Sequence, residues 1–257
     1  MQRNRVPASG FITLQGNRLF GSVRNMKQRI LCVIAHPGDE AFGPSGTLAL
    51  LAKKYEVHLV CLTDGASDKR FHPLGAKVKA VRAKELQRSA GILGIKKVHF
   101  LDYGDGSLCD NLYHEVADGL QKLVNQLHPS LLVTNELRGM SGHLDHVAAG
   151  LITSFVYRNS EFIDGVLYTV APRTASDAMQ DYFVYFPPGF NRDEVDLIVD
   201  IRSVFAKKLA AARSHVSQGK DVERVTKRWR QIPREEWFLV NERRKILDIP
   251  QSCLNRE

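Results

Sequence analysis

Two short polar motifs in this sequence contain side chains of the kinds that bind metal ions. His36 and Asp39 directly follow the apolar run at residues 30–35, within the letters A-H-P-G-D-E. His143 and His146 follow another apolar run, within G-H-L-D-H. A catalytic zinc ion takes three imidazole or carboxylate ligands and keeps one position open for a water, whose pKa it lowers to about 7. His36, Asp39 and His146 together supply such a set.

The segments around these motifs predict a parallel sheet that would bring the motifs together. Residues 30–35 and 131–134 are apolar and too short for helices, which is typical of buried strands. Residues 75–93 and 112–127 have the spacing of amphipathic helices, so strands and helices alternate. In a doubly wound sheet of order 3-2-1-4-5, strands one and four are neighbours, and ligands bind outside their carboxyl ends. We therefore predict an α/β, Rossmann-like, mostly parallel sheet of this order, with helices on both faces and a smaller β-containing C-terminal part.

The composition fits one domain with a sizeable core. The chain has 257 residues and is 44% hydrophobic. Its four cysteines are far apart and form no C-x-x-C pair, so the pattern indicates no disulfide framework and fits a reducing cytoplasm. No run approaches the roughly 18 apolar residues that span a bilayer. We expect residues 26–257 to form a single domain and residues 1–25 to be an extension outside the fold.

The net charge of +8 comes mainly from two segments. Residues 1–28 hold five basic side chains and no acid, and residues 219–234 hold six basic side chains and two acids. We interpret both as solvated flanking segments, with a weak patch for polyanions as the alternative. Neither aromatic interleaving nor a helix-turn-helix pattern accompanies the charge, which argues against nucleic acid as the partner.

The paired motifs resemble those of the PIG-L/LmbE-like deacetylase family. These are zinc hydrolases that remove N-acyl groups, mostly from N-acetylglucosamine conjugates. The resemblance covers residues 29–159 well, with weaker echoes at residues 214–218 and 236–238. It implies that His36, Asp39 and His146 hold the metal.

The same resemblance implies roles for three further residues. His143 matches the histidine that stabilises the tetrahedral intermediate and protonates the leaving amine, and Asp145 matches the carboxylate that orients that histidine. Arg82 matches an arginine on the substrate side. Each has a structural alternative: Arg82 could be a solvated cation on its helix, and Asp145 could cap the helix that follows it. For Glu40 we favour a role in anchoring its loop.

Gly38 departs from the family pattern, which has an aspartate there as the general base. A glycine cannot take a proton, and general-base catalysis typically contributes 10²- to 10⁴-fold, or about 3 to 5 kcal/mol of transition-state stabilisation. We expect the space of the missing carboxylate to be open to solvent. Gly38→Asp should then raise activity, unless a positive φ at this glycine resists a side chain.

These observations predict a zinc-dependent hydrolase that removes an N-acetyl (N-acyl) group from a small-molecule substrate, an amino sugar or an N-acetylglucosamine conjugate, with activity impaired by Gly38. Another divalent metal could take the place of zinc. The alternative is a zinc-containing pseudoenzyme that binds a glycan or a protein partner without efficient turnover. The identity of the substrate and the oligomeric state stay open at this stage.

Overall fold

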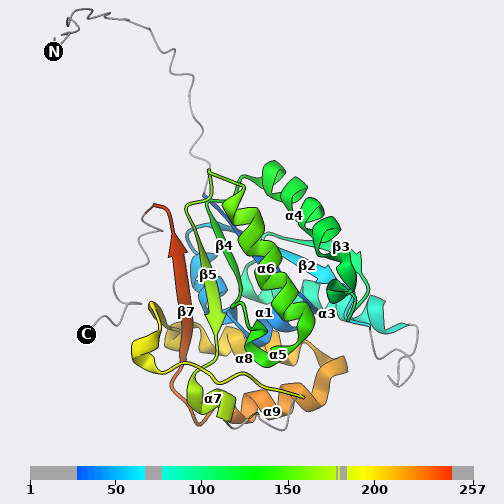
Figure 1. Ribbon diagram of the computed structural model, residues 1–257. Coiled ribbons are helices and arrows are strands. Elements are labelled where there is room, and N and C mark those ends of the chain that lie inside the picture. Colours follow the sequence, from blue (N-terminus) through cyan, green and yellow to red (C-terminus); the bar gives the residue numbers. More distant parts are fainter. Residues whose placement is uncertain (1–27, 67–76, 178, 180–183, 245–257) are drawn as a thin grey trace, which may run out of the picture.

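The computed structural model describes residues 28–66, 77–177, 179 and 184–244, so the extension predicted at residues 1–25 lies outside the described residues. Within them, strands form one sheet of order β3-β2-β1-β4-β5-β7-β6 (Figure 1). The strands are β1 (Arg29–Ile34), β2 (Glu56–Thr63), β3 (Lys97–Tyr103), β4 (Leu131–Asn135), β5 (Gly165–Val170), β6 (Leu197–Asp200) and β7 (Glu235–Glu242). The first five are parallel in the predicted order 3-2-1-4-5, which is confirmed.

Helices cover both faces of the sheet. On one face lie α2 (Ser45–Leu51), α3 (Val78–Leu93) and α8 (Phe205–Arg213), and on the other lie α4 (Tyr113–Leu127) and α6 (Leu144–Arg158). Successive side chains of β1 alternate between these layers, because a strand points its side chains to opposite faces in turn. Ile30 and Cys32 pack with the first group of helices, and Leu31 and Val33 pack with the second.

The pairing of β1 with β4 places the two motifs side by side. The register aligns Ile30 with Leu131 and Cys32 with Val133, so both strands end at the same edge of the sheet. At this edge lie the remaining α-helices of the described residues, α1 (Asp39–Phe42), α5 (Gly139–Gly142), α7 (Arg173–Asp177) and α9 (Gly219–Trp229). In Figure 1 it is the lower edge, toward which the arrow of β5 points.

The C-terminal part closes the sheet and forms a wall at the same edge. β7 lies between β5 and β6 and is antiparallel to both. The interpretation of residues 219–234 as a solvated flank is wrong for α9, because Thr226 and Trp229 of this helix are buried. Its basic side chains occupy one face while these two residues turn inward. None of the helices in the described ranges is both long and apolar enough to cross a membrane.

Candidate active site

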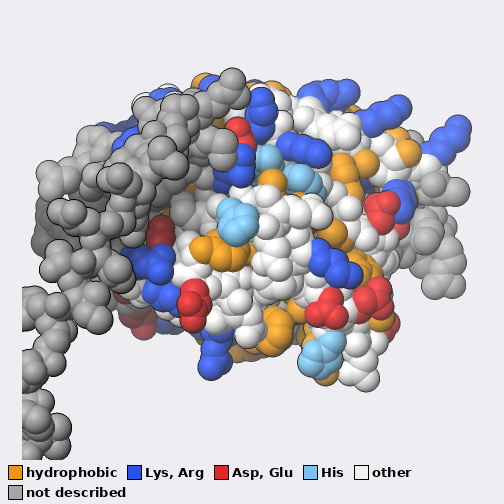
Figure 2. Space-filling view, turned by 90° about the horizontal axis from the view of Figure 1, so that it is seen from above, with side chains coloured by type: hydrophobic (Ala, Val, Ile, Leu, Met, Phe, Trp, Pro, Cys, Tyr) orange, Lys and Arg blue, Asp and Glu red, His pale blue; other side chains and the backbone are white. Residues whose placement is uncertain are grey.

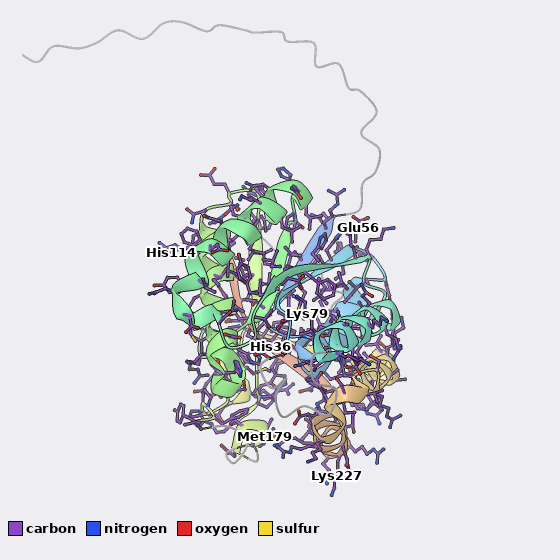
Figure 3. All side chains as sticks on the ribbon, turned by 90° about the vertical axis from the view of Figure 1, so that its right-hand side faces the viewer. His36, Glu56, Lys79, His114, Met179 and Lys227 are labelled. Carbon is purple, nitrogen blue, oxygen red and sulfur yellow. The ribbon has the colours of Figure 1, made fainter. Side chains whose placement is uncertain are left out.

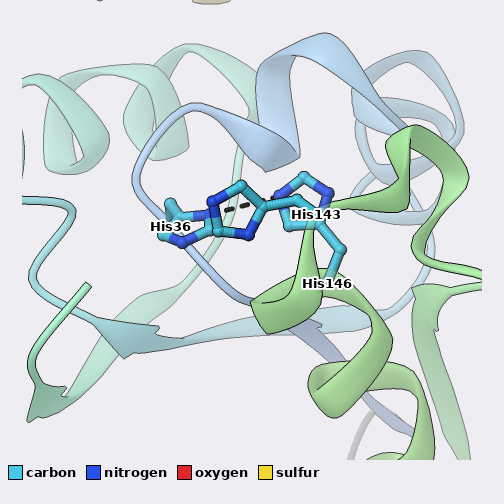
Figure 4. A group of neighbouring side chains, drawn as sticks. All are labelled: His36, His143 and His146. Atoms are coloured by element: carbon cyan, nitrogen blue, oxygen red, sulfur yellow. Dashed lines mark hydrogen bonds between the residues drawn. The ribbon is translucent and has the colours of Figure 1, made fainter. Parts of the chain in front are cut away.

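The three predicted metal ligands converge at the ends of β1 and β4. His36 Nδ1 lies 3.2 Å from His146 Nε2 and 3.7 Å from Asp39 Oδ2, and His146 Nε2 lies 3.3 Å from Asp39 Oδ1. Figure 4 shows the contact between the two histidines. Bonds of 2.0–2.1 Å around a tetrahedral ion put neighbouring ligand atoms roughly 3.3 Å apart, so these distances suit zinc. All three side chains are at most 15% exposed.

In His36 and His146, the ring nitrogen that points away from the convergence point, here called the outer nitrogen, faces hydrogen-bond acceptors. These acceptors decide which ring nitrogen keeps its lone pair. His36 Nε2 lies 3.0 Å from Asp105 Oδ1 and 3.1 Å from Asp145 Oδ2. His146 Nδ1 lies 3.2 Å from the carbonyl oxygen of Gly139. A hydrogen on each outer nitrogen leaves a lone pair on each inner nitrogen, and hydrogen-bonded outer nitrogens of this kind are the rule for metal-binding histidines. The donor set therefore fits a divalent cation.

The carboxylates and histidines at this point shift each other's pKa. Burial opposes ionisation of Asp39, but His146 and His36 outweigh it and hold the pKa of Asp39 well below its usual range. Burial likewise disfavours a charge on His36, but hydrogen bonds to Asp105, Asp145 and Asp39 raise the pKa of His36 well above its usual range. A positive charge is therefore favoured beside these carboxylates.

His143 differs from the two converging histidines in what its ring contacts. It is the N-cap of α6, and its Nδ1 accepts a hydrogen bond of 3.2 Å from the backbone N–H of Asp145. Burial first, and then His36 and His146, lower the pKa of His143. The neutral ring consequently carries its hydrogen on Nε2.

His143 could also join a group of metal ligands. One nitrogen from each of His36, His143 and His146 lies within 4.8 Å of the other two. Asp39 contacts both other histidines, at 3.7 Å from His36 Nδ1 and 3.3 Å from His146 Nε2, and stays the predicted third ligand.

Asp145 is fully buried, and it supports His143 through its backbone N–H, whereas its carboxylate contacts His36. Its carboxylate accepts hydrogen bonds from the backbone N–H groups of Gly106 at 2.7 Å and Leu108 at 3.1 Å, in addition to its contact with His36. Burial opposes its ionisation, but these partners lower the pKa of Asp145. Its backbone N–H supports His143, so this residue links both histidines to the loop after β3.

Arg82 is held at the site rather than solvated on α3. It donates to the carbonyl oxygen of Pro37 at 2.8 Å and to that of Gly65. Its guanidinium also lies 3.9 Å from Asp105 Oδ2. Sequence reasoning assigned no role to Asp105, although the turn-rich letters Y-G-D-G at the end of a strand were a usable signal.

The expectation of open space beside Gly38 is wrong. A Cβ added there would lie 2.8 and 3.1 Å from the two terminal atoms of the Gln218 amide, and 3.2 Å from the Phe42 ring. Gly38 also has a φ of 113°, which side chains of L-residues rarely adopt. With its amide oriented to suit its neighbours, Gln218 donates to the Pro37 carbonyl at 3.2 Å and accepts from Arg82 at 2.9 Å. The turn after α8 brings this glutamine over the first motif.

Glu40 anchors the loop, as we predicted. One carboxylate oxygen accepts from the Gly38 N–H at 2.9 Å, and the other lies 2.7 Å from His215 Nε2. Glu40 and His215 are both fully buried. The echo of the family pattern near residue 215 therefore marks a structural contact with the first motif.

The site opens into a cavity of about 670 Å³. His36, Asp39, His143 and His146 line it, together with side chains from α8, α9 and the segment leading into β7. Figure 3 shows His36 inside the molecule, with Met179 and Lys227 nearer the outer surface at that end. A cavity of this size suits a ligand larger than a single sugar ring.

Comparison with known proteins matches residues 31–157 to the family model described as PIG-L, GlcNAc-PI de-N-acetylase. Diacetylchitobiose deacetylase of Thermococcus kodakarensis is 31% identical over 205 residues, covering 76% of this chain and 71% of that protein. Two solved structures share the fold. N,N'-diacetylchitobiose deacetylase of Pyrococcus horikoshii has a TM-score of 0.62 at 24% identity, covering 84% of each chain. A 4-carboxy-2-hydroxymuconate hydratase of Pseudomonas putida has a TM-score of 0.60 at 22% identity, covering 86% of this chain and 99% of the hydratase, so the fold alone does not decide the reaction.

Proposed function

The chain belongs to the PIG-L family of deacetylases, and from this premise we propose that it is a zinc-dependent hydrolase that releases acetate from an N-acetylated amino sugar or its conjugate. The observation that carries the proposal is the convergence of His36 Nδ1, His146 Nε2 and the Asp39 carboxylate on one point. Zinc bound by these three residues would polarise the acetyl carbonyl and lower the pKa of a water molecule.

His143 is the residue we assign to proton transfer. Its Nε2–H would donate to the carbonyl oxygen as negative charge develops there. When the C–N bond breaks, the same nitrogen would pass a proton to the leaving amine and recover one from the hydroxyl group that the attacking water contributed. Amide and water then yield amine and acetic acid, which ionises.

Asp145 and Arg82 would hold this arrangement in place. Asp145 holds His36 by its carboxylate and His143 by its backbone N–H. Arg82 and Asp105 line the cavity beside each other and offer a donor and an acceptor to the hydroxyl groups of a sugar.

Gly38 supplies no general base, so we expect slow turnover. Glu40 does not replace one, because it is fully buried and bonded to His215. Asp145 is likewise committed to three partners. The turnover rate should therefore lack part of the 10²- to 10⁴-fold acceleration that a positioned general base contributes.

The test combines metal analysis with assays of acetate release from a panel of N-acetylglucosamine conjugates. We expect one zinc per chain, release that a chelator abolishes, and recovery when zinc is added back. The glycine at position 38 favours one rival, a zinc-containing pseudoenzyme. Zinc and a glycan bound stoichiometrically, with no acetate from any conjugate, would establish that rival instead.

A further inference from the structure

Part of the cavity has an apolar wall. Its members all line the cavity and pack in one hydrophobic cluster that continues into the core; they are Phe42, Ile201, Phe205, Val225, Trp229 and Ile232. We call this part the apolar arm. Phe42 comes from α1, the helix that begins with the ligand Asp39, and the other five residues come from α8, α9 and the segments next to them.

Two buried charges beside the apolar arm, Lys208 and Glu236, satisfy each other. Lys208 is 3% exposed, and its Nζ donates at 2.6 Å to both Glu236 and the Gly43 carbonyl, 4.5 Å from the centre of the Trp229 ring. Glu236 also accepts from the backbone N–H groups of Gly46 and Thr47. Lys208 and Glu236 therefore have partners, whereas Arg228 and Arg234 also line the cavity, with the Arg234 guanidinium 4.6 Å from the centre of the Phe205 ring. Between these charges, what the apolar arm itself offers a ligand is apolar surface.

A second apolar feature lies next to residues that line the cavity. Leu144 is 59% exposed and directly follows His143, and Tyr185 is 65% exposed and directly precedes Phe186. Both exposed side chains adjoin cavity residues in sequence, and neither is among the residues that line the cavity.

We propose that the substrate carries an apolar chain or ring on its amino sugar, and that the apolar arm holds this group while the sugar lies at His143 and Arg82. Only the placement of the sugar at His143 and Arg82 rests on the proposed function. The apolar group could be the aglycone or the N-acyl chain, and both present the same chemistry to Phe42, Val225 and Trp229.

Binding can be tested without turnover, because the chain has two tryptophans, Trp229 and Trp237, and both line the cavity. Hexyl β-D-glucoside and methyl β-D-glucoside are titrated against the zinc-loaded protein while tryptophan fluorescence is recorded. Each methylene that leaves water contributes favourably, so the hexyl compound should bind at least tenfold more tightly. Equal affinities would overturn the proposal.

Turnover then distinguishes the two sources of the apolar group. We compare the hexyl and methyl glycosides of N-acetylglucosamine, and methyl glycosides that carry N-hexanoyl or N-acetyl groups. A tenfold gain in kcat/KM for the hexyl glycoside assigns the apolar arm to the aglycone, and a gain for the N-hexanoyl compound assigns it to the acyl chain. If the protein binds the hexyl compound selectively but hydrolyses none of the compounds, the proposed function is refuted. The proposal that the apolar arm binds an apolar group would still hold.

A matched pair of variants locates the effect. Val225 lines the apolar arm, whereas Val222 lies on the same helix and is not among the residues that line the cavity. Val225→Asn should lower the hexyl-to-methyl affinity ratio at least fivefold, and Val222→Asn should leave it unchanged. If both folded variants kept the parent ratio, the apolar group would bind elsewhere and the proposal would fail.

Discussion

The sheet carries a histidine cluster at each end, and the two clusters differ in what surrounds them. At the carboxyl end, His36 Nδ1 and His146 Nε2 are 3.2 Å apart. At the amino end, His58 Nδ1 and His99 Nε2 are 3.1 Å apart, near the starts of β2 and β3. In Figure 3 the label of Glu56, a neighbour of His58, lies at the end of the molecule away from His36. Figure 2 shows this amino end, where some histidine side chains lie beside lysines and arginines and others beside hydrophobic or acidic side chains.

Spacing alone therefore does not make a metal site. Within the described ranges, the groups that could hold a metal all include His36, and none includes His58 or His99. Loops from separate strands bring Asp39, Asp105 and Asp145 to the carboxyl end. At the amino end, Glu56 faces the outer nitrogen of His58, at 3.0 Å. The sheet edge that collects the βα loops is the one that can assemble a site, as in other open α/β sheets.

Removing one converging histidine should separate the two clusters most sharply. His146→Ala removes one of three ligands and should abolish stoichiometric zinc binding. The rate of any acetate release should fall at least 10³-fold. His58→Ala, the control at the amino end, should keep one zinc per chain and at least half of the activity. Metal analysis and acetate assays on both variants provide the check. Full zinc occupancy in His146→Ala would refute the assigned ligand set.

His143→Ala tests whether His143 transfers protons while His36, Asp39 and His146 hold the metal. Because we assign the third ligand position to Asp39, which contacts both His36 and His146, this variant should keep zinc while acetate release falls about 10²- to 10³-fold. Zinc content and rate are measured on the same preparation. Zinc loss as complete as in His146→Ala would make His143 a ligand instead.

Gly38→Asp tests whether the missing base can be restored. A side chain there meets both a φ of 113° and the Gln218 amide, so we expect a loss of about 1 to 3 kcal/mol in the free energy of unfolding and no gain in rate. A melting scan and an acetate assay measure the two effects.

The paired variant Gly38→Asp/Gln218→Ala removes the contact but keeps the backbone strain. It should regain only part of the stability. A single Gly38→Asp variant that is as stable as the parent and tenfold faster would contradict this account, and would restore the expectation of open space.

The smallest effect concerns the pH dependence of stability at the amino end. Burial first, and then His58 and Lys97, lower the pKa of His99 to about 4. Since the unfolded chain takes up this proton near pH 6.5, the folded state loses stability as pH falls from 6.5 toward 4. Denaturant unfolding at several pH values should show a flatter slope in this window for His99→Gln. Identical slopes for the two proteins would argue against the lowered pKa.

Several features of the fold and the site follow from the sequence alone. The apolar run before His36 predicted β1, the alternation of strands and helices predicted the order 3-2-1-4-5, and that order placed His36 and Asp39 beside His146. These inferences succeeded because side-chain periodicity and short motifs are local properties of the chain.

Other features were decided by the tertiary structure. Asp105 reaches His36, and Gln218 covers Gly38, across long sequence separations that carry no periodic signal. A glycine adopts either sign of φ, so its letter alone could not show whether an aspartate would fit at position 38. The charged segment of α9 was interpreted as solvated because charge dominates its composition. Only packing against α8 and β7 determines that Trp229 turns inward and lines the cavity.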